Sequence, residues 1–167
     1  LHTTARRQRQ MCIRDRDSIL FFPNPTTAVS NIIHSLKLEP SDEILMTNHE
    51  YGALIRAWCS MSNKTGVRIV QQEIPIPLVS KEKFKNDFWS GVSDKTKVIF
   101  ISHITSPTAL ILPIKEIIQM AKSRGILTIV DGAHVPGHIP LNINDLGCDF
   151  YTLSLIHISE PTRLAGI

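Results

Sequence analysis

The stretch TIVDGAHVPG, residues 128–137, ends an apolar run on a carboxylate and places an imidazole three residues later. Its first three residues are β-branched and typical of a buried strand. Asp131 at the end of that strand would be costly to bury unless a partner compensated its charge. A ligand with a protonated ring nitrogen would supply such a partner. The alternative is that Asp131 is a turn or capping residue and His134 an ordinary loop residue.

A second polar stretch, NPTTAVSNII at residues 24–33, has the signature of a helix start. Asn24 suits the N-cap, and Pro25 suits the first helical position, where a missing N–H costs nothing. Thr26 and Thr27 are then expected to present free backbone N–H groups and hydroxyls at the positive end of a helix, which suits a phosphate. The alternative is that these residues only cap the helix.

A phosphate site together with a buried carboxylate points to pyridoxal phosphate. An aspartate held against its ring nitrogen keeps the ring protonated and makes it an electron sink. Asp131 would take that place, and His134 could reach the phenolic oxygen of the ring. Tyr51, at the start of a predicted helix, could lie flat on the ring face. The usual fingerprints of dinucleotide and P-loop sites, G-x-G-x-x-G and G-x-x-x-x-G-K-[ST], do not occur in the sequence.

The elements that must position these residues alternate along the chain. Apolar runs of strand length cover 19–22, 43–47, 67–71, 97–102, 126–130 and, more weakly, 149–152. Helical periodicity fills the gaps, around 29–36, 54–61, 84–92 and 114–121. This alternation predicts an α/β fold with a mostly parallel sheet and helices on both faces. In such sheets ligands bind outside the carboxyl ends of the strands, which is where the polar stretches fall.

Length, composition and charge restrict the class of protein. The chain has 167 residues, 43% hydrophobic and 20% charged, as expected of one globular domain. Its net charge of +3 comes from residues 1–16, whose five Arg and one Asp give +4, so the remainder carries 3 − 4 = −1. We therefore expect no nucleic-acid partner, and no apolar run is long enough to span a membrane. Three cysteines without metal-type spacing or a signal peptide predict a cytoplasmic location.

Histidines near the candidate site do not form a convincing metal motif. His134 and His138 are spaced i, i+4 in HVPGH, but Pro136 and Gly137 between them preclude the helix that would align the two rings. His103 would be a third candidate ligand. The spacing therefore predicts no metal site.

The span from Asp17 to Thr152 resembles the large-domain core of class V aminotransferases, which are pyridoxal-phosphate enzymes of the aspartate-aminotransferase fold type, fold type I. The resemblance is carried by NPTTAVSNII, NHEYGALIRAW, SHITSPTALILPI and, most specifically, VDGAHVPGHIPLNINDLGCDFY. It implies an amino-acid substrate and a homodimer in the full-length protein. It also implies that pyridoxal 5′-phosphate is bound by Thr26, Thr27, Tyr51, Ser106, Asp131 and His134.

The subgroup is indicated by three positions. Cysteine desulfurases have His, Gln and Asn where this chain has Tyr51, His134 and Ser106, so HEYGA with DGAH looks more like the isopenicillin N epimerase group. Epimerase, lyase, desulfurase and aminotransferase chemistry all stay open. The alternative function is a non-catalytic α/β domain that binds a phosphorylated ligand or a partner subunit.

The chain departs from the family after CDFYT. The family continues into a His-Lys pair whose lysine bonds to the cofactor, whereas this sequence has no lysine after Lys122. We therefore expect no catalytic residue here and an inactive fragment. Residues 1–16 and 153–167 resemble translated sequencing-adapter read-through and are expected to be non-native tails. That leaves 17–152 as a partial cofactor-binding large domain, although a natural truncated relative with a basic arm is the competing interpretation.

Overall fold

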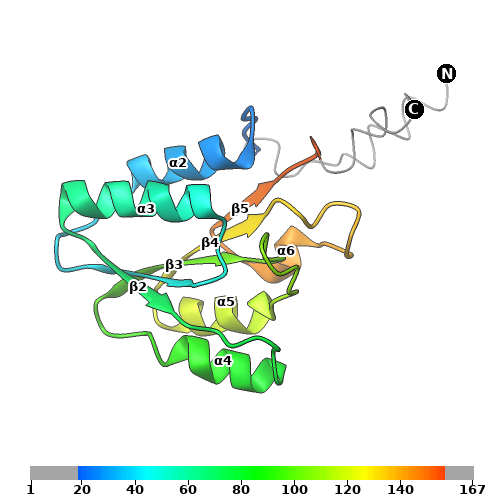
Figure 1. The fold of residues 1–167 in the computed structure, drawn as a ribbon. Helices are drawn as coiled ribbons and strands as arrows, with labels where there is room; N and C mark the ends of the chain where they lie inside the picture. Colours follow the sequence, from blue (N-terminus) through cyan, green and yellow to red (C-terminus); the bar gives the residue numbers. More distant parts are fainter. Residues whose placement is uncertain (1–18, 157–167) are drawn as a thin grey trace.

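Five parallel strands form one sheet in the order β2-β1-β3-β4-β5, seen in a computed structural model that describes residues 19–156 (Figure 1). In chain order the elements are α2 Pro25–Ser35, β1 Glu43–Thr47, α3 Gly52–Thr65, β2 Arg68–Gln72, α4 Lys81–Trp89, β3 Thr96–Ser102, α5 Ile114–Ser123, β4 Leu127–Gly132, α6 Ile143–Leu146 and β5 Phe150–Leu153. This confirms the predicted α/β class. The predicted tail 1–16, and the part of 153–167 beyond Ile156, lie outside the described residues.

Helices cover both faces of the sheet, and each face has its own apolar core. On the face under α2 and α3, the buried ring of Trp58 lies 5.6 Å from that of Phe100, measured between ring centroids. On the face under α4 and α5, Phe84 and Phe88 pack with Ile117. Successive strand residues point to opposite faces, so the near-continuous apolar strands supply both cores at once. Within the described range, every helix is too short or too polar to cross a bilayer.

The helix boundaries follow the local signals in the sequence. Asn24 is the N-cap of α2, and Pro25 is its first residue, as predicted. Pro113 is the N-cap residue of α5. Gly125, just beyond the C-cap of α5, has φ +66°, the left-handed conformation that glycine adopts without strain.

The predicted strand at 19–22 is wrong. These residues form no regular element, and the side chains of Leu20 and Phe21 are 77% and 95% exposed. Four apolar residues resemble a strand in composition, but a strand also needs a neighbour to accept its hydrogen bonds. Among the described residues none of the five strands pairs with this segment.

Candidate active site

The carboxyl ends of the strands form the edge of the sheet where the polar side chains gather. Because all five strands are parallel, their carboxyl ends lie at one edge. Both α2 and α3 begin at this edge and run back along the sheet, so the positive ends of two helix dipoles face it (Figure 1). The ends of the strands and the starts of two helices thus lie at one edge, which is where ligands bind in parallel α/β sheets.

Asp131 is buried at this edge, with 6% of its surface exposed. It pairs in register with Ser102 of β3 on one side and Thr152 of β5 on the other, so the three side chains share one face of the sheet. Its Oδ1 accepts hydrogen bonds from the Ala133 N–H at 3.0 Å and the Thr152 hydroxyl at 3.3 Å. The hydrogen bond from the Ala133 N–H is the one expected if Asp131 were only a turn residue. A turn residue does not need to be buried on the sheet, however, and Asp131 is buried there.

A second buried carboxyl group, Glu50, lies beside Asp131. Its two oxygens accept hydrogen bonds from the Thr47 hydroxyl at 2.6 Å and the Ser102 hydroxyl at 2.5 Å, and only 3% of the residue is exposed. Burial raises the pKa of Glu50 to about 7, with the Asp131 charge adding to the increase and the two hydroxyl donors opposing it. Glu50 lies in the segment NHEYGALIRAW but was not among the predicted site residues.

The start of α2 differs from its prediction in one respect. Asn24 Oδ1 accepts both the Thr27 N–H at 2.8 Å and the Thr27 hydroxyl at 3.1 Å. The expectation that Thr27 offers a free N–H and hydroxyl is therefore wrong, because the N-cap side chain already binds both groups. Thr26 lies in the same first turn, where helical N–H groups have no partner within the helix, and its side chain is partly buried.

The other predicted site residues lie on loops and helix starts at the same edge. Tyr51 is the N-cap of α3, with its side chain 45% exposed and making no capping bond. His134 lies in the turn after β4 and is partly buried, whereas Ser106 is exposed in the loop after β3. That loop is held by a hydrogen bond between the Thr105 and Thr108 hydroxyls at 2.7 Å. Hydrogen bonding and strand register therefore join Asp131 to the neighbouring strands, while the roles of these three residues stay predictions.

A second polar pair lies on the opposite face of the sheet. His103 Nδ1 and the Tyr151 hydroxyl are 2.7 Å apart, and Tyr151 packs with the core under α4 and α5. Burial lowers the pKa of His103 and raises that of Tyr151. Gly132 is needed beside them, because a Cβ there would lie 2.1 Å from the Tyr151 ring. Within residues 19–156, no group of three or more metal-binding side chains is placed to hold a metal ion.

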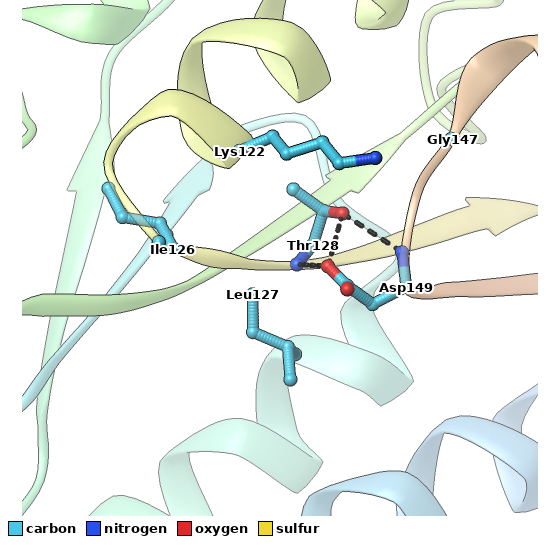
Figure 2. Close-up of a pocket in the computed structure, with 7 residues that line it drawn as sticks. Lys122, Ile126, Leu127, Thr128, Gly147 and Asp149 are labelled. Atoms are coloured by element: carbon cyan, nitrogen blue, oxygen red, sulfur yellow. Dashed lines mark hydrogen bonds between the residues drawn. The ribbon is translucent and has the colours of Figure 1, made fainter.

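A hollow at the amino ends of β4 and β5 is separate from this edge (Figure 2). Its polar groups bond to one another: the Asp149 carboxylate accepts the Thr128 N–H at 2.7 Å and the Thr128 hydroxyl at 2.8 Å. Lys122 extends along its rim. These bonds join the beginnings of two strands, so we assign the hollow a structural role.

Comparison with known proteins identifies one family and several relatives that match most of this chain. The family model "Aminotransferase class-V" matches residues 2–161. The chain is 34% identical to isopenicillin N epimerase from Streptomyces clavuligerus, over 77% of this chain and 32% of that protein. It is 31% identical to a probable cysteine desulfurase from Halalkalibacterium halodurans, over 89% of this chain and 36% of that protein. The chain thus spans about a third of the length of these curated relatives.

The fold has solved counterparts. A structure of a C-DES mutant, with glycine covalently linked to its pyridoxal-phosphate cofactor, superposes with a TM-score of 0.70 at 24% identity. The likeness covers 79% of this chain and 35% of that one. The sheet and its helices therefore have the fold of part of that longer chain, in agreement with the predicted parallel α/β sheet.

Proposed function

Because the chain belongs to the class-V aminotransferase family, we propose that it forms the cofactor-binding part of an enzyme that acts on an amino acid. Pyridoxal 5′-phosphate is the cofactor of this family. The relatives include an isopenicillin N epimerase and a cysteine desulfurase, so the proposal covers epimerase, lyase, desulfurase and aminotransferase chemistry. One observation carries it: a buried carboxylate, Asp131, lies at the carboxyl end of the interior strand β4, at the edge where α2 and α3 begin.

The charges at this edge suit the two ends of the cofactor. Asp131 places negative charge on the sheet, which favours a cationic ring nitrogen. The first turn of α2 offers the Thr26 N–H and the positive end of a helix dipole, which favours a phosphate. A group that is positive at one end and negative at the other therefore finds complementary charge at both ends.

Five of the six predicted residues would hold this group, and Thr27 is left out because its N–H and hydroxyl already donate to Asn24. Asp131 would accept a hydrogen bond from the ring nitrogen and keep it protonated, and Thr26 would donate its hydroxyl to the phosphate. Tyr51 would cover a ring face, and His134 would donate to the phenolic oxygen. Ser106 would line the same site from the loop after β3. When bound, the protonated ring draws electrons from the α-carbon of the amino acid.

Thr26→Ala tests the phosphate end of the site. We expect the affinity for pyridoxine 5′-phosphate to fall by about 1–3 kcal/mol, the cost of a lost hydrogen bond to a charged group. The affinity for pyridoxine, which has no phosphate, should not change. Pyridoxine 5′-phosphate is chosen because it has no aldehyde and cannot react with surface lysines. Fluorescence titration measures both ligands.

Two neighbouring variants are the controls for this result. Thr27→Ala should weaken the phosphate ligand less than Thr26→Ala, because the Thr27 hydroxyl already donates to Asn24. Asn24→Ala should lower the free energy of unfolding by about 0.5–2 kcal/mol, the cost of a lost N-cap. Equal affinity of Thr26→Ala and the unmodified chain for the phosphate ligand would remove Thr26 from the site.

We also propose that the 167-residue chain does not turn over amino acids by itself. Its sequence has no lysine after Lys122, the region where the family places the lysine that bonds to the cofactor. Without that side chain no amine is positioned to move the α-proton. Incubation of the purified chain with pyridoxal phosphate and L-cysteine or L-alanine should give no sulfide, pyruvate or D-alanine. Any of these products, formed in proportion to the chain, would contradict the proposal.

A further inference from the structure

Glu50 is a buried titratable group that the roles above do not use. It is the third residue after β1, yet its side chain turns inward and bridges the ends of β1 and β3 through the Thr47 and Ser102 hydroxyls. Ser102 is the register partner of Asp131, so Glu50 reaches the residue directly beside that carboxylate. Two acids from different loops are therefore gathered in one buried cluster.

We propose that Glu50 and Asp131 form a buried acid pair, and that a ring cation bound at Asp131 displaces a proton from Glu50. Glu50 is then a positioning residue that adjusts the charge of the site to the charge of its ligand. The acid pair stands on the geometry of the apo protein, whereas the displacement step rests on the proposed cofactor.

The surroundings of Glu50 can serve both of its protonation states. A hydroxyl can donate to a carboxylate or accept from a carboxylic acid, so Thr47 and Ser102 keep hydrogen bonds with Glu50 in either form. The cluster therefore has no need to rearrange when the proton leaves. A buried acid without such adaptable partners would leave a polar atom unsatisfied in one of the two states.

Among the charged groups near Glu50, Asp131 is the one whose charge changes the pKa of Glu50. From β4, Asp131 adds to the rise in the pKa of Glu50, and among the described residues no other charged side chain contributes. The neighbouring His49 turns away, with its Nε2 2.7 Å from the Ile74 carbonyl oxygen. His103 also turns away, towards Tyr151 on the other face of the sheet.

Ligand binding should then be linked to pH in a defined direction. A cation beside the pair favours the ionised form of Glu50, so the pKa of Glu50 is lower in the complex than in the free protein. Binding therefore releases a proton, and affinity rises with pH until Glu50 is ionised in the free protein. That limit lies near pH 7, where the pKa of Glu50 stands.

Infrared spectroscopy of the ligand-free chain tests the acid pair directly. Exposed carboxyl groups ionise near pH 4, so a protonated carboxyl band that persists to pH 6 must come from a perturbed group. We expect such a band, with a midpoint of about 7, in the unmodified chain. It should be absent in Glu50→Gln, shifted to lower pH in Asp131→Asn, and unchanged in Glu116→Gln, which removes an exposed carboxyl of α5. A chain without a band above pH 6 would overturn the pair.

Calorimetry with pyridoxine 5′-phosphate tests the displacement step. Titrations at pH 6.5 in two buffers of different ionisation enthalpy give the number of protons released per ligand. We expect the unmodified chain to release up to one proton more than Glu50→Gln, and Glu116→Gln to match the unmodified chain. Subtracting the proton release of Glu50→Gln from that of the unmodified chain removes the protons that the ligand itself releases. Equal proton release by the unmodified chain and Glu50→Gln would overturn the coupling.

The two experiments separate the failure of this inference from the failure of the proposed function. If the infrared band titrates as expected but pyridoxine 5′-phosphate does not bind, the acid pair stands and the cofactor assignment is overturned. If the ligand binds with a phosphate-dependent affinity but no band appears above pH 6, the cofactor assignment stands and the acid pair is overturned.

Discussion

Asp131→Asn should weaken the binding of pyridoxine 5′-phosphate to this chain by about 2–5 kcal/mol, the usual cost of leaving one member of a charge pair alone. At about 1.4 kcal/mol per tenfold, this is a loss of roughly 30-fold to several thousand-fold. Asparagine keeps the shape of the side chain and an oxygen that can accept the Ala133 N–H, so the turn after β4 should survive. The ultraviolet spectrum of any ligand still bound should show a ring that is more readily deprotonated.

The control for this result is Asp94→Asn. Asp94 is a fully exposed residue that pairs with Arg124 at 2.7 Å, and surface pairs of this kind contribute about 0–1 kcal/mol. The variant changes the net charge by the same amount but lies away from the carboxyl edge, so its ligand affinity should not change. Equal affinity in Asp131→Asn and Asp94→Asn would show that Asp131 does not hold the ring.

Trp58→Ala should lower the free energy of unfolding by about 3–5 kcal/mol, the range for truncating a buried aromatic side chain. Trp58 has no exposed surface and packs on Phe100, in the core that holds α2 and α3 against the sheet. Domains are stable by only about 5–15 kcal/mol, so this variant should be largely unfolded in mild denaturant. Urea unfolding followed by circular dichroism measures the change.

Trp58→Phe separates packing from hydrogen bonding at the same position. Within the described part of the chain, the Trp58 Nε1–H is a buried donor without a partner, so phenylalanine removes an unsatisfied group while keeping an aromatic ring. We expect this variant to lose less than half the stability that Trp58→Ala loses. Equal losses in the two variants would mean that a phenyl ring fills this site no better than alanine, and that the full volume of the indole ring is what stabilises this core.

The sequence predicted those strands for which a single pattern of apolar residues is enough to identify the element. An apolar run before a helical pattern identified β1, β3 and β4, because a central parallel strand is apolar on both faces. The same signal failed at 19–22, because four apolar residues do not reveal whether a neighbouring strand exists. The composition of a segment shows that it could form a strand, but a strand forms only where an adjacent strand can pair with its backbone.

The candidate site was predictable only in part, for a similar reason. Asp131 could be placed because its position at the end of a strand fixes both its edge and its face of the sheet. Glu50 lies between a strand and a helix, where no periodicity fixes the direction of a side chain. The occupied N–H of Thr27 could have been predicted, because an asparagine at the N-cap usually accepts a hydrogen bond from the N–H three residues later. Polar residues in loops thus need the fold before they can be assigned.

A crystal structure of the chain with bound pyridoxine 5′-phosphate would show whether Asp131 holds the ring. We expect the ring nitrogen within hydrogen-bonding distance of the Asp131 carboxylate and the phosphate on the first turn of α2, beside Thr26. Tyr51 should lie against the ring. A ligand bound elsewhere, for example with its phosphate on Lys122 at the amino ends of β4 and β5, would contradict it. So would a ligand at the carboxyl edge whose ring nitrogen points away from Asp131.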